Sequence, residues 1–193
     1  MLQLAHIARP RLRLQQFDRR QRQSLDFLAQ LVPELDGEAL SKDGNSEIYV
    51  MNRDGSGVRR LTTHPAIDTT PTWSPSGAQI AFTSDRTGSP QIWSVSADGL
   101  NLRRLSSESY ADRPTWSPAP YNEIAFSVRT GSRFDIKIYQ VENGATRQIT
   151  FGEGTNESPA WAPNGKHLAF MSTRNARASQ IFVIRRDGKD VRQ

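Results

Sequence analysis

The sequence predicts an all-β fold: a partial (open) β-propeller of four-stranded antiparallel blades, preceded by an irregular or helical N-terminal segment. The first observation is a recurring tripeptide, Trp-Ser-Pro at 73–75 and 116–118 and Trp-Ala-Pro at 161–163, with copies 43 and 45 residues apart. The second is that each copy opens a cassette of short apolar runs separated by turn residues. Four short strands in about 44 residues are typical of a propeller blade.

The cassette has the same order in every copy, and we name its expected strands a to d from the inside of the propeller outward. Strand a carries the Trp motif, with a proline two residues before each Trp. Strand b is the apolar run at 79–84, 123–127 and 167–172, and strand c is the run at 91–95, 135–139 and 180–184. These runs are β-branched and aromatic and are too short for helices.

Strands c and d are joined by glycine turns at Asp54-Gly55, Asp98-Gly99, Asn143-Gly144 and Asp187-Gly188. Type I′ hairpin turns need positive φ at both central residues, which these dipeptides tolerate best, so we expect type I′ hairpins. The aspartates are therefore interpreted as turn residues rather than calcium ligands. Strand d is the short basic run that follows, at 58–62, 102–106 and 146–150.

The cassettes divide the chain into a non-repeat segment, 1–41, and a partial propeller, 42–193. The propeller consists of a half blade at 42–62 without strands a and b, complete blades at 71–106 and 114–150, and a truncated blade at 159–193. Because an open arc leaves sheet edges unpaired, we expect a segment of a larger protein, and dimers or aggregates of the isolated chain. The apolar residues expected on its uncovered flanks are Ile48, Val50, Leu168 and Phe170.

Segment 1–41 separates into a basic part, 1–22, and an acidic part, 24–40, and is compatible with a helix around 21–32. Two interpretations stay open: a basic amphipathic helix for a membrane or an acidic partner, or an adventitious N-terminus. An uninterrupted apolar stretch followed by a cleavage site is missing, so we expect no signal peptide in this sequence. No run approaches the roughly 20 apolar residues of a membrane span.

The net charge of +5 invites a nucleic-acid hypothesis, but the position of the charges argues against it. The arginines at 59–60, 103–104, 147 and 192 all fall on the outermost strand, where charges protect sheet edges, so we expect a solvated rim and no nucleic-acid partner. The chain has no cysteine, which excludes disulfides and thiol chemistry.

Three stretches resemble the WD-like repeat of the TolB family, the periplasmic propellers of the Tol-Pal envelope system: 48–55, 71–77 and 80–86. The resemblance covers 42–193. It implies a periplasmic, non-catalytic scaffold that binds the peptidoglycan-associated lipoprotein and Tol proteins, and that supports outer-membrane integrity, constriction at division and protein import. Similar repeats occur in prolyl-oligopeptidase-type peptidases and bacterial sensor proteins, so a propeller fragment of either is the alternative.

The residues themselves offer no catalytic constellation. His167 takes a strand b position that Gln79 and Glu123 hold in the other cassettes, which favours a strand residue. A Gly-x-Ser-x-Gly elbow, a phosphate loop and metal-ligand spacing are all missing from the sequence. We therefore expect no enzymatic activity, no metal and no cofactor.

Binding is expected on the loops that connect strand d to a and strand b to c, because these share one face and vary between cassettes. The candidate partner-binding residues there are Asp68, Asp85, Arg86, Asp112, Arg113, Arg133, Asn156, Glu157 and Arg174. Among them, Asp68, Asp112 and Glu157 stand four or five residues before a Trp, at the expected channel mouth. They either face a basic partner or hydrogen-bond their own loop.

The tryptophans of the motif, Trp73, Trp116 and Trp161, are either stacking platforms for a ligand or packing residues between blades. Their strict position in the repeat favours the second interpretation. A large ring fills the space between twisted sheets and buries about 150–250 Å².

Overall fold

The computed structural model describes residues 27–29, 45–52, 54–175 and 178–193, in which strands are the only regular elements. The strands are β1 (Phe27–Ala29), β2 (Tyr49–Asn52), β3 (Arg59–Arg60), β4 (Asp68–Trp73), β5 (Gln79–Ser84), β6 (Gln91–Ser96), β7 (Arg103–Arg104), β8 (Ala111–Trp116), β9 (Glu123–Thr130), β10 (Arg133–Gln140), β11 (Thr146–Gln148), β12 (Asn156–Trp161), β13 (His167–Ser172) and β14 (Gln180–Arg185). Every strand pair is antiparallel, which confirms the all-β prediction.

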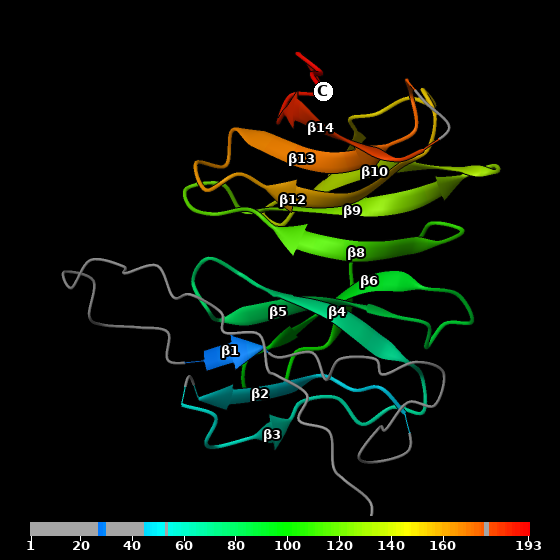
Figure 1. Cartoon of the computed structure of the whole chain (residues 1–193). Helices are drawn as coiled ribbons and strands as arrows, with labels where there is room; N and C mark the ends of the chain where they lie inside the picture. Colours follow the sequence, from blue (N-terminus) through cyan, green and yellow to red (C-terminus); the bar gives the residue numbers. More distant parts are fainter. Residues whose placement is uncertain (1–26, 30–44, 53, 176–177) are drawn as a thin grey trace, which may run out of the picture.

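The strands form four sheets, each a meander of consecutive strands. We call them blade 1 (β1–β3), blade 2 (β4–β7), blade 3 (β8–β11) and blade 4 (β12–β14). The sheets stack face to face in chain order, with blade 1 and blade 4 at opposite ends of the stack (Figure 1). The described part of the chain is thus an open propeller, as predicted.

Blade 1 contains a strand from the segment that we expected to lie outside the repeat. Leu28 of β1 pairs with Met51 in the same register in which Ile80 pairs with Val95 in blade 2. The strand b that we expected to be missing from this blade is therefore present, and the expectation of a helix is wrong for Phe27–Ala29. The rest of segment 1–41 lies outside the described residues.

The c–d hairpins are real, but their turns are not type I′. Gly99, Gly144 and Gly188 have positive φ, whereas Asp98, Asn143 and Asp187 do not appear among the described non-glycine residues that do. The Gly99 N–H donates to the Ser96 carbonyl, and Ser96 N–H to the Leu100 carbonyl, so a type I turn is followed by a left-handed glycine. The Asp98 carboxylate accepts the Leu100 N–H at 2.9 Å, which stabilises the aspartate without positive φ.

Adjacent blades bury an apolar strand motif between them. In blades 2 to 4, strand b turns a β-branched or leucine residue and a phenylalanine toward the preceding blade, as Ile124 and Phe126 do in blade 3. The equivalent pairs, Ile80 with Phe82 and Leu168 with Phe170, form the cores of the other two interfaces. We call this side of a blade its near face and the opposite side its far face.

The three motif tryptophans add to these interfaces. Trp116 is buried in the core between blades 2 and 3, while Trp73 and Trp161 pack against their cores with part of the ring exposed. The Trp161 indole N–H donates to the Thr115 carbonyl of blade 3 at 3.1 Å, a direct bond between blades. The rings therefore serve packing between blades.

Our prediction of which apolar residues lie on the open flanks is wrong. Ile48, Val50, Leu168 and Phe170 are all buried, because they face a neighbouring blade inside the arc. Alternate residues of a strand point to opposite sides of the sheet, so the exposed flank of blade 4 carries the other set, which includes Met171, Ile181 and Val183.

A buried hydrogen-bond relay joins strands c and d in blades 1 to 3. In blade 3 the Ile136 N–H donates to the Thr150 hydroxyl at 2.8 Å, and that hydroxyl donates to the Asp135 carboxylate at 2.8 Å. The same relay runs through Thr62 to Glu47 in blade 1 and through Ser106 to Gln91 in blade 2. It satisfies the N–H at the start of strand c where the short strand d has no carbonyl to offer.

Trp116→Ala should lower the free energy of unfolding by about 3–5 kcal/mol, because it empties a large aromatic site in the core. Arg103→Ala, on the exposed outer strand, removes only a long hydrogen bond of 3.5 Å to the Tyr139 hydroxyl and should lower it by less than about 0.5 kcal/mol. Chemical denaturation of both variants measures the difference. Equal midpoints would contradict the assignment of inside and outside.

Thr150→Val should lower the free energy of unfolding by about 1–3 kcal/mol, because it leaves the buried Ile136 N–H and Asp135 carboxylate without their shared partner. The matched control is Thr146→Val at the start of β11, where the side chain is exposed and little change is expected. If the relay did not contribute to stability, the two variants would have the same midpoint of unfolding in urea.

Candidate functional site

Strand a of blades 2 to 4 contains a backbone irregularity. The residue before the motif proline has positive φ in each blade: Thr70 at 50°, Arg113 at 53° and Ser158 at 55°. The register of strand a against strand b shifts at this point. In compensation, the Arg113 N–H donates to the Thr83 hydroxyl of blade 2, and the Ser158 N–H to the Ser127 hydroxyl of blade 3. The irregularity thus bonds blade 3 to blade 2 and blade 4 to blade 3.

This geometry brings three of the predicted binding residues together across blades 3 and 4. Arg113 lies between two carboxylates, with its Nε 3.8 Å from Asp112 Oδ2 and its Nη1 3.9 Å from Glu157 Oε2. The same guanidinium donates to the Ser158 hydroxyl, and the Tyr110 hydroxyl donates to Asp112 Oδ2 at 3.3 Å. We call these five residues the Arg113 cluster.

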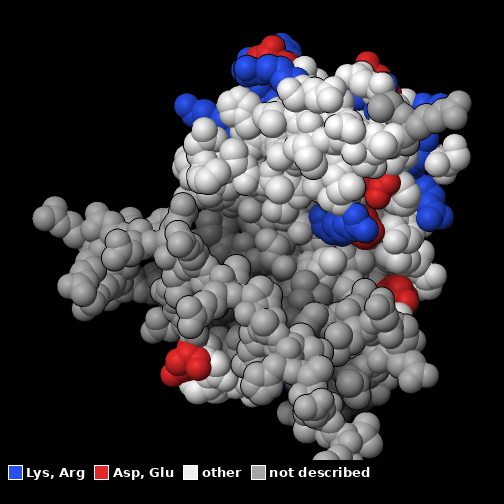
Figure 2. Space-filling model, viewed as in Figure 1, with Lys and Arg blue, Asp and Glu red and all other residues white. Residues whose placement is uncertain are grey.

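The Arg113 cluster is open to solvent on one side. The Arg113 side chain is 49% exposed, while those of Asp112 and Glu157 are more covered. On the face that β8 and β12 present to the viewer, a group of basic and acidic side chains lies beside a broad uncharged area (Figure 2). Ion pairs near 4 Å are weak, so the cluster can exchange its internal partners for those of another molecule.

The charges of the Arg113 cluster favour binding of a positively charged group. Two carboxylates share one guanidinium within it. Burial raises the pKa of Asp112 above its usual value, with Arg113 acting in the opposite direction. Burial, followed by the charge of Asp112, also raises the pKa of Tyr110, which keeps its hydroxyl protonated as a donor. A positively charged side chain from a partner would lower the energetic cost of keeping these partly buried carboxylates charged.

Four of the other predicted residues serve the interior of the blades. Asp68 is buried and forms an ion pair of 2.8 Å with Arg86, whose guanidinium lies over the Trp93 ring. At the same position in blade 4, the buried Asn156 accepts a hydrogen bond from Arg174, which lies over Phe182. These residues fix the b–c loop to strand a and do not present free groups to a partner.

Of the two alternatives for Asp68, Asp112 and Glu157, Asp68 thus follows the second, because its carboxylate bonds Arg86 of the b–c loop. Counted from the pairing partners, Asp68 and Asn156 occupy one strand position, and Asp112 and Glu157 occupy the next. Only the second position reaches the cluster. One residue of shift along a strand reverses the face of the sheet.

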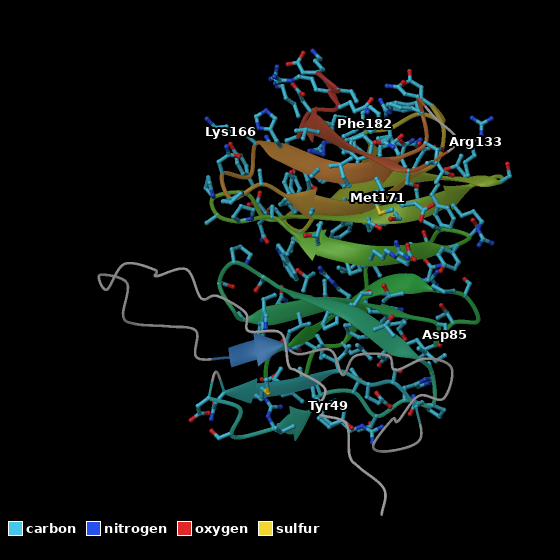
Figure 3. The ribbon with its side chains drawn as sticks, viewed as in Figure 1. Tyr49, Asp85, Arg133, Lys166, Met171 and Phe182 are labelled. Carbon is cyan, nitrogen blue, oxygen red and sulfur yellow. The ribbon has the colours of Figure 1, made fainter. Side chains whose placement is uncertain are left out.

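Asp85 lies on the b–c loop of blade 2, and Arg133 begins β10 at the end of the b–c loop of blade 3. The Asp85 carboxylate accepts the Ile67 N–H at 2.8 Å, and Arg133 donates to the Gly152 carbonyl. Both lie at one end of the blades, whereas Lys166, in an a–b turn, lies at the other end (Figure 3). This arrangement agrees with the predicted orientation of loops and turns.

The sequence reasoning missed Tyr110 and Ser158. Neither belongs to the repeat motif, and the hydroxyl of Ser158 joins the cluster only because positive φ turns the chain at this position. Among the described residues, no group of three or more His, Asp or Glu side chains is placed to hold a metal ion. The described ranges also hold no helix with the length and apolar character needed to cross a bilayer.

Comparison with known proteins identifies the fold family. Residues 37–193 match the family model described as the TolB beta propeller domain. The chain belongs to this family. It is 37% identical over 149 residues to the Tol-Pal system protein TolB of Bordetella pertussis, a match that covers 77% of this chain and 33% of that protein. An uncharacterized protein of Agrobacterium fabrum is 30% identical over 144 residues, 67% of this chain and 48% of that protein. The chain thus spans a third to a half of the length of these relatives.

Solved structures agree on the fold. The putative TolB from Agrobacterium tumefaciens superposes with a TM-score of 0.68 at 23% identity, covering 79% of this chain and 57% of that one. Enzymes also share the fold at lower identity, among them a puromycin hydrolase, with a TM-score of 0.60 at 18% identity over 76% of this chain and 24% of that one. Likeness at this level shows a TolB-type propeller fold and leaves the activity to other evidence.

Asp112→Asn tests the electrostatics of the cluster. A carboxyl group with a raised pKa in the folded state contributes stability below its unfolded pKa, near 3.8, and loses it as pH rises through the folded value. The variant has no carboxyl group at this position, so it does not lose this stability. Its free energy of unfolding minus that of the unmodified chain should therefore increase from acid to neutral pH. Urea titrations at several pH values measure it, and a constant difference would contradict the raised pKa.

Proposed function

We propose that this chain is a non-catalytic protein-binding propeller that acts with proteins of the Tol-Pal system. The observation that carries the proposal is the Arg113 cluster, an open group of charges on the variable face of a TolB-family propeller. The cluster joins two blades, so a partner that binds there contacts residues of both. The partners that family membership suggests are the peptidoglycan-associated lipoprotein and Tol proteins.

The chemistry of the cluster suits a polypeptide ligand with a basic side chain. An incoming Lys or Arg can pair with Asp112 and Glu157, which lie on either side of Arg113. The Ser158 and Tyr110 hydroxyls and the exposed Arg113 fork offer further polar contacts for backbone carbonyls. Complementary charge of this kind sets orientation and the rate of association more than it sets affinity.

The same membership leads us to propose a periplasmic location and roles in envelope integrity, constriction at division and protein import. Of these, partner binding is the step that can be assigned to residues of this chain. The alternative is that the chain belongs to the propeller of a peptidase, a class also found among the structures that share this fold. A peptidase would hydrolyse peptide substrates, whereas the proposed module would bind without turnover.

The proposal is tested with purified peptidoglycan-associated lipoprotein and TolA from the bacterium that encodes this chain. Calorimetry or biolayer interferometry should detect binding of at least one of them. The double variant Asp112→Lys with Glu157→Lys should bind about tenfold more weakly or worse, because it opposes a basic partner with like charge. Peptide substrates should show no turnover.

The matched control is Glu142→Lys, an exposed charge reversal in a c–d turn at the opposite end of the blades. It should leave binding within about twofold, as expected for a surface change outside an interface. No binding to either protein would overturn the Tol-Pal assignment. Equal losses in the double variant and the control would overturn the Arg113 cluster as the binding site.

A further inference from the structure

Blades 2 and 4 each use an arginine of the b–c loop to bind their own strand a. In blade 2, Arg86 forms an ion pair of 2.8 Å with the buried Asp68. In blade 4, Arg174 donates to the buried Asn156 at 3.1 Å. Each arginine therefore fixes its loop inside the blade and is occupied by that contact.

Blade 3 lacks both partners of this contact. The pairing of Ala111 with Val128, in place of Asp68 with Ser84, gives blade 3 an alanine on strand a and Thr130 in the loop. Ala111 and Val128 are buried in the apolar core between blades 2 and 3. The arginine of blade 3 is Arg129, one residue earlier. Since alternate residues of a strand point to opposite sides of the sheet, Arg129 points to the far face, toward blade 4.

On this side, Arg129 lies over two aromatic rings. Its guanidinium carbon is 4.7 Å from the centroid of the Tyr110 ring and 5.4 Å from that of the Phe134 ring, within the range of about 6 Å for cation–π contacts. The two rings meet edge to face with their centroids 5.6 Å apart. Phe134 also pairs with Arg129 in the β9–β10 hairpin, whose strands have eight residues each, against six in β5 and β6 of blade 2 (Figure 1).

The guanidinium of Arg129 is available to another molecule. Arg129 is exposed, and among the described residues no acceptor receives a hydrogen bond from its side chain. Stacking on a ring uses the flat face of a guanidinium and leaves the N–H groups at its edge for hydrogen bonds. Arg129 thus differs from Arg86 and Arg174, whose N–H groups bind inside the blade.

Arg129 is continuous with the Arg113 cluster. The Tyr110 ring lies against Arg129, while its hydroxyl donates to Asp112 at 3.3 Å. Asp112 pairs with Ser127, which lies two residues before Arg129 on β9, so the two charged residues are offset by about 7 Å along the sheet. An extended polypeptide places the side chains of residues i and i+2 on one side with the same offset. The surface therefore offers a negative and a positive position to one extended segment.

Building on the proposed function, we propose that Arg129 is a second position of the partner site. It binds a carboxylate of the same polypeptide that pairs a basic side chain with Asp112 and Glu157. The segment that fits both positions is extended and carries Lys or Arg at i and Asp or Glu at i+2, or the reverse order. Arginine forms paired hydrogen bonds with a carboxylate. The rings of Tyr110 and Phe134 hold the guanidinium before binding, which reduces the side-chain entropy lost in the complex.

Two simpler roles of Arg129 predict different results. If the guanidinium only packs on the rings, a partner gains nothing from a carboxylate at this position. If Arg129 only adds positive charge, lysine replaces it without loss of binding. A stacked site with paired hydrogen bonds requires arginine, because the ammonium group of lysine is a point charge without a planar fork. Arg129→Lys therefore distinguishes the proposed position from general charge.

The experiment selects ligands of the 193-residue chain from random short peptides displayed on phage. Peptides that also bind the triple variant Asp112→Lys, Glu157→Lys and Arg129→Glu are discarded, so that the remaining peptides depend on this surface. They should share a basic and an acidic residue two positions apart. Synthetic copies should bind Arg129→Glu about tenfold more weakly or worse in fluorescence anisotropy, and should also bind Arg129→Lys more weakly.

The matched control is Arg104→Glu, the same charge reversal at an exposed arginine of β7, on the outer strand of blade 2. It should leave binding within about twofold, because it lies outside the proposed interface. Thermal melts verify that each variant is folded. If Arg129→Glu is not, Arg129→Gln takes its place, since it also removes the guanidinium.

Peptides that share a basic residue without an acidic one would overturn the role of Arg129 and leave the proposed function standing. Equal affinity for the unmodified chain and for Arg129→Lys would also overturn that role. Peptides whose acidic residue depends on Arg129, without a basic residue, would support the carboxylate position and contradict the basic partner of Asp112 and Glu157. If no selected peptide depends on this surface, both proposals are overturned.

Discussion

The structure depends on a hydroxyl that stands between two strands. In each of blades 1 to 3, a Ser or Thr at the end of strand d accepts the N–H at the start of strand c and donates to the residue just before it. The relay replaces a ladder bond that a two- or three-residue outer strand cannot make. It also extends inward: in blade 3 the Asp135 carboxylate accepts the Gly152 N–H and the Asn156 amide as well. The outer strand of one blade is thereby connected to strand a of the next.

The candidate site lies directly downstream of that connection. Asn156 begins β12, and the next two residues are Glu157 and Ser158, which complete the Arg113 cluster. The arginine comes from blade 3 and its second carboxylate from blade 4, so the distance between them depends on how the two blades are held. The buried relay and the apolar interface between blades therefore position the Arg113 cluster, although none of their own atoms belongs to it.

Much of the fold could be predicted from local signals. The Trp motif, the apolar runs and the Gly turns identified the blades, because each is determined within one cassette. Some errors concern interactions between cassettes, and others concern side-chain positions and bonds within one cassette. Rim arginines such as Arg59 and Arg147 were expected to be solvated, yet each donates to a carbonyl of the following blade, since only the stacked structure places that carbonyl within reach. Asp68 was grouped with Asp112 and Glu157, but its pairing with Ser84 puts it one strand position away from them, at a buried position. The prediction of I′ turns is wrong because the Asp and Asn side chains accept the backbone N–H two residues on.

Arg113 combines two properties that a mutation can separate. Its side chain lies between the two carboxylates, and its backbone has a positive φ that costs energy in a residue other than glycine. Selection for stability alone would favour glycine or asparagine there, as it would at Thr70 and Ser158. An arginine at this position thus represents a compromise between stability of the fold and binding of a partner. A directed-evolution screen for heat resistance would tend to replace this arginine while the stability of the propeller increases.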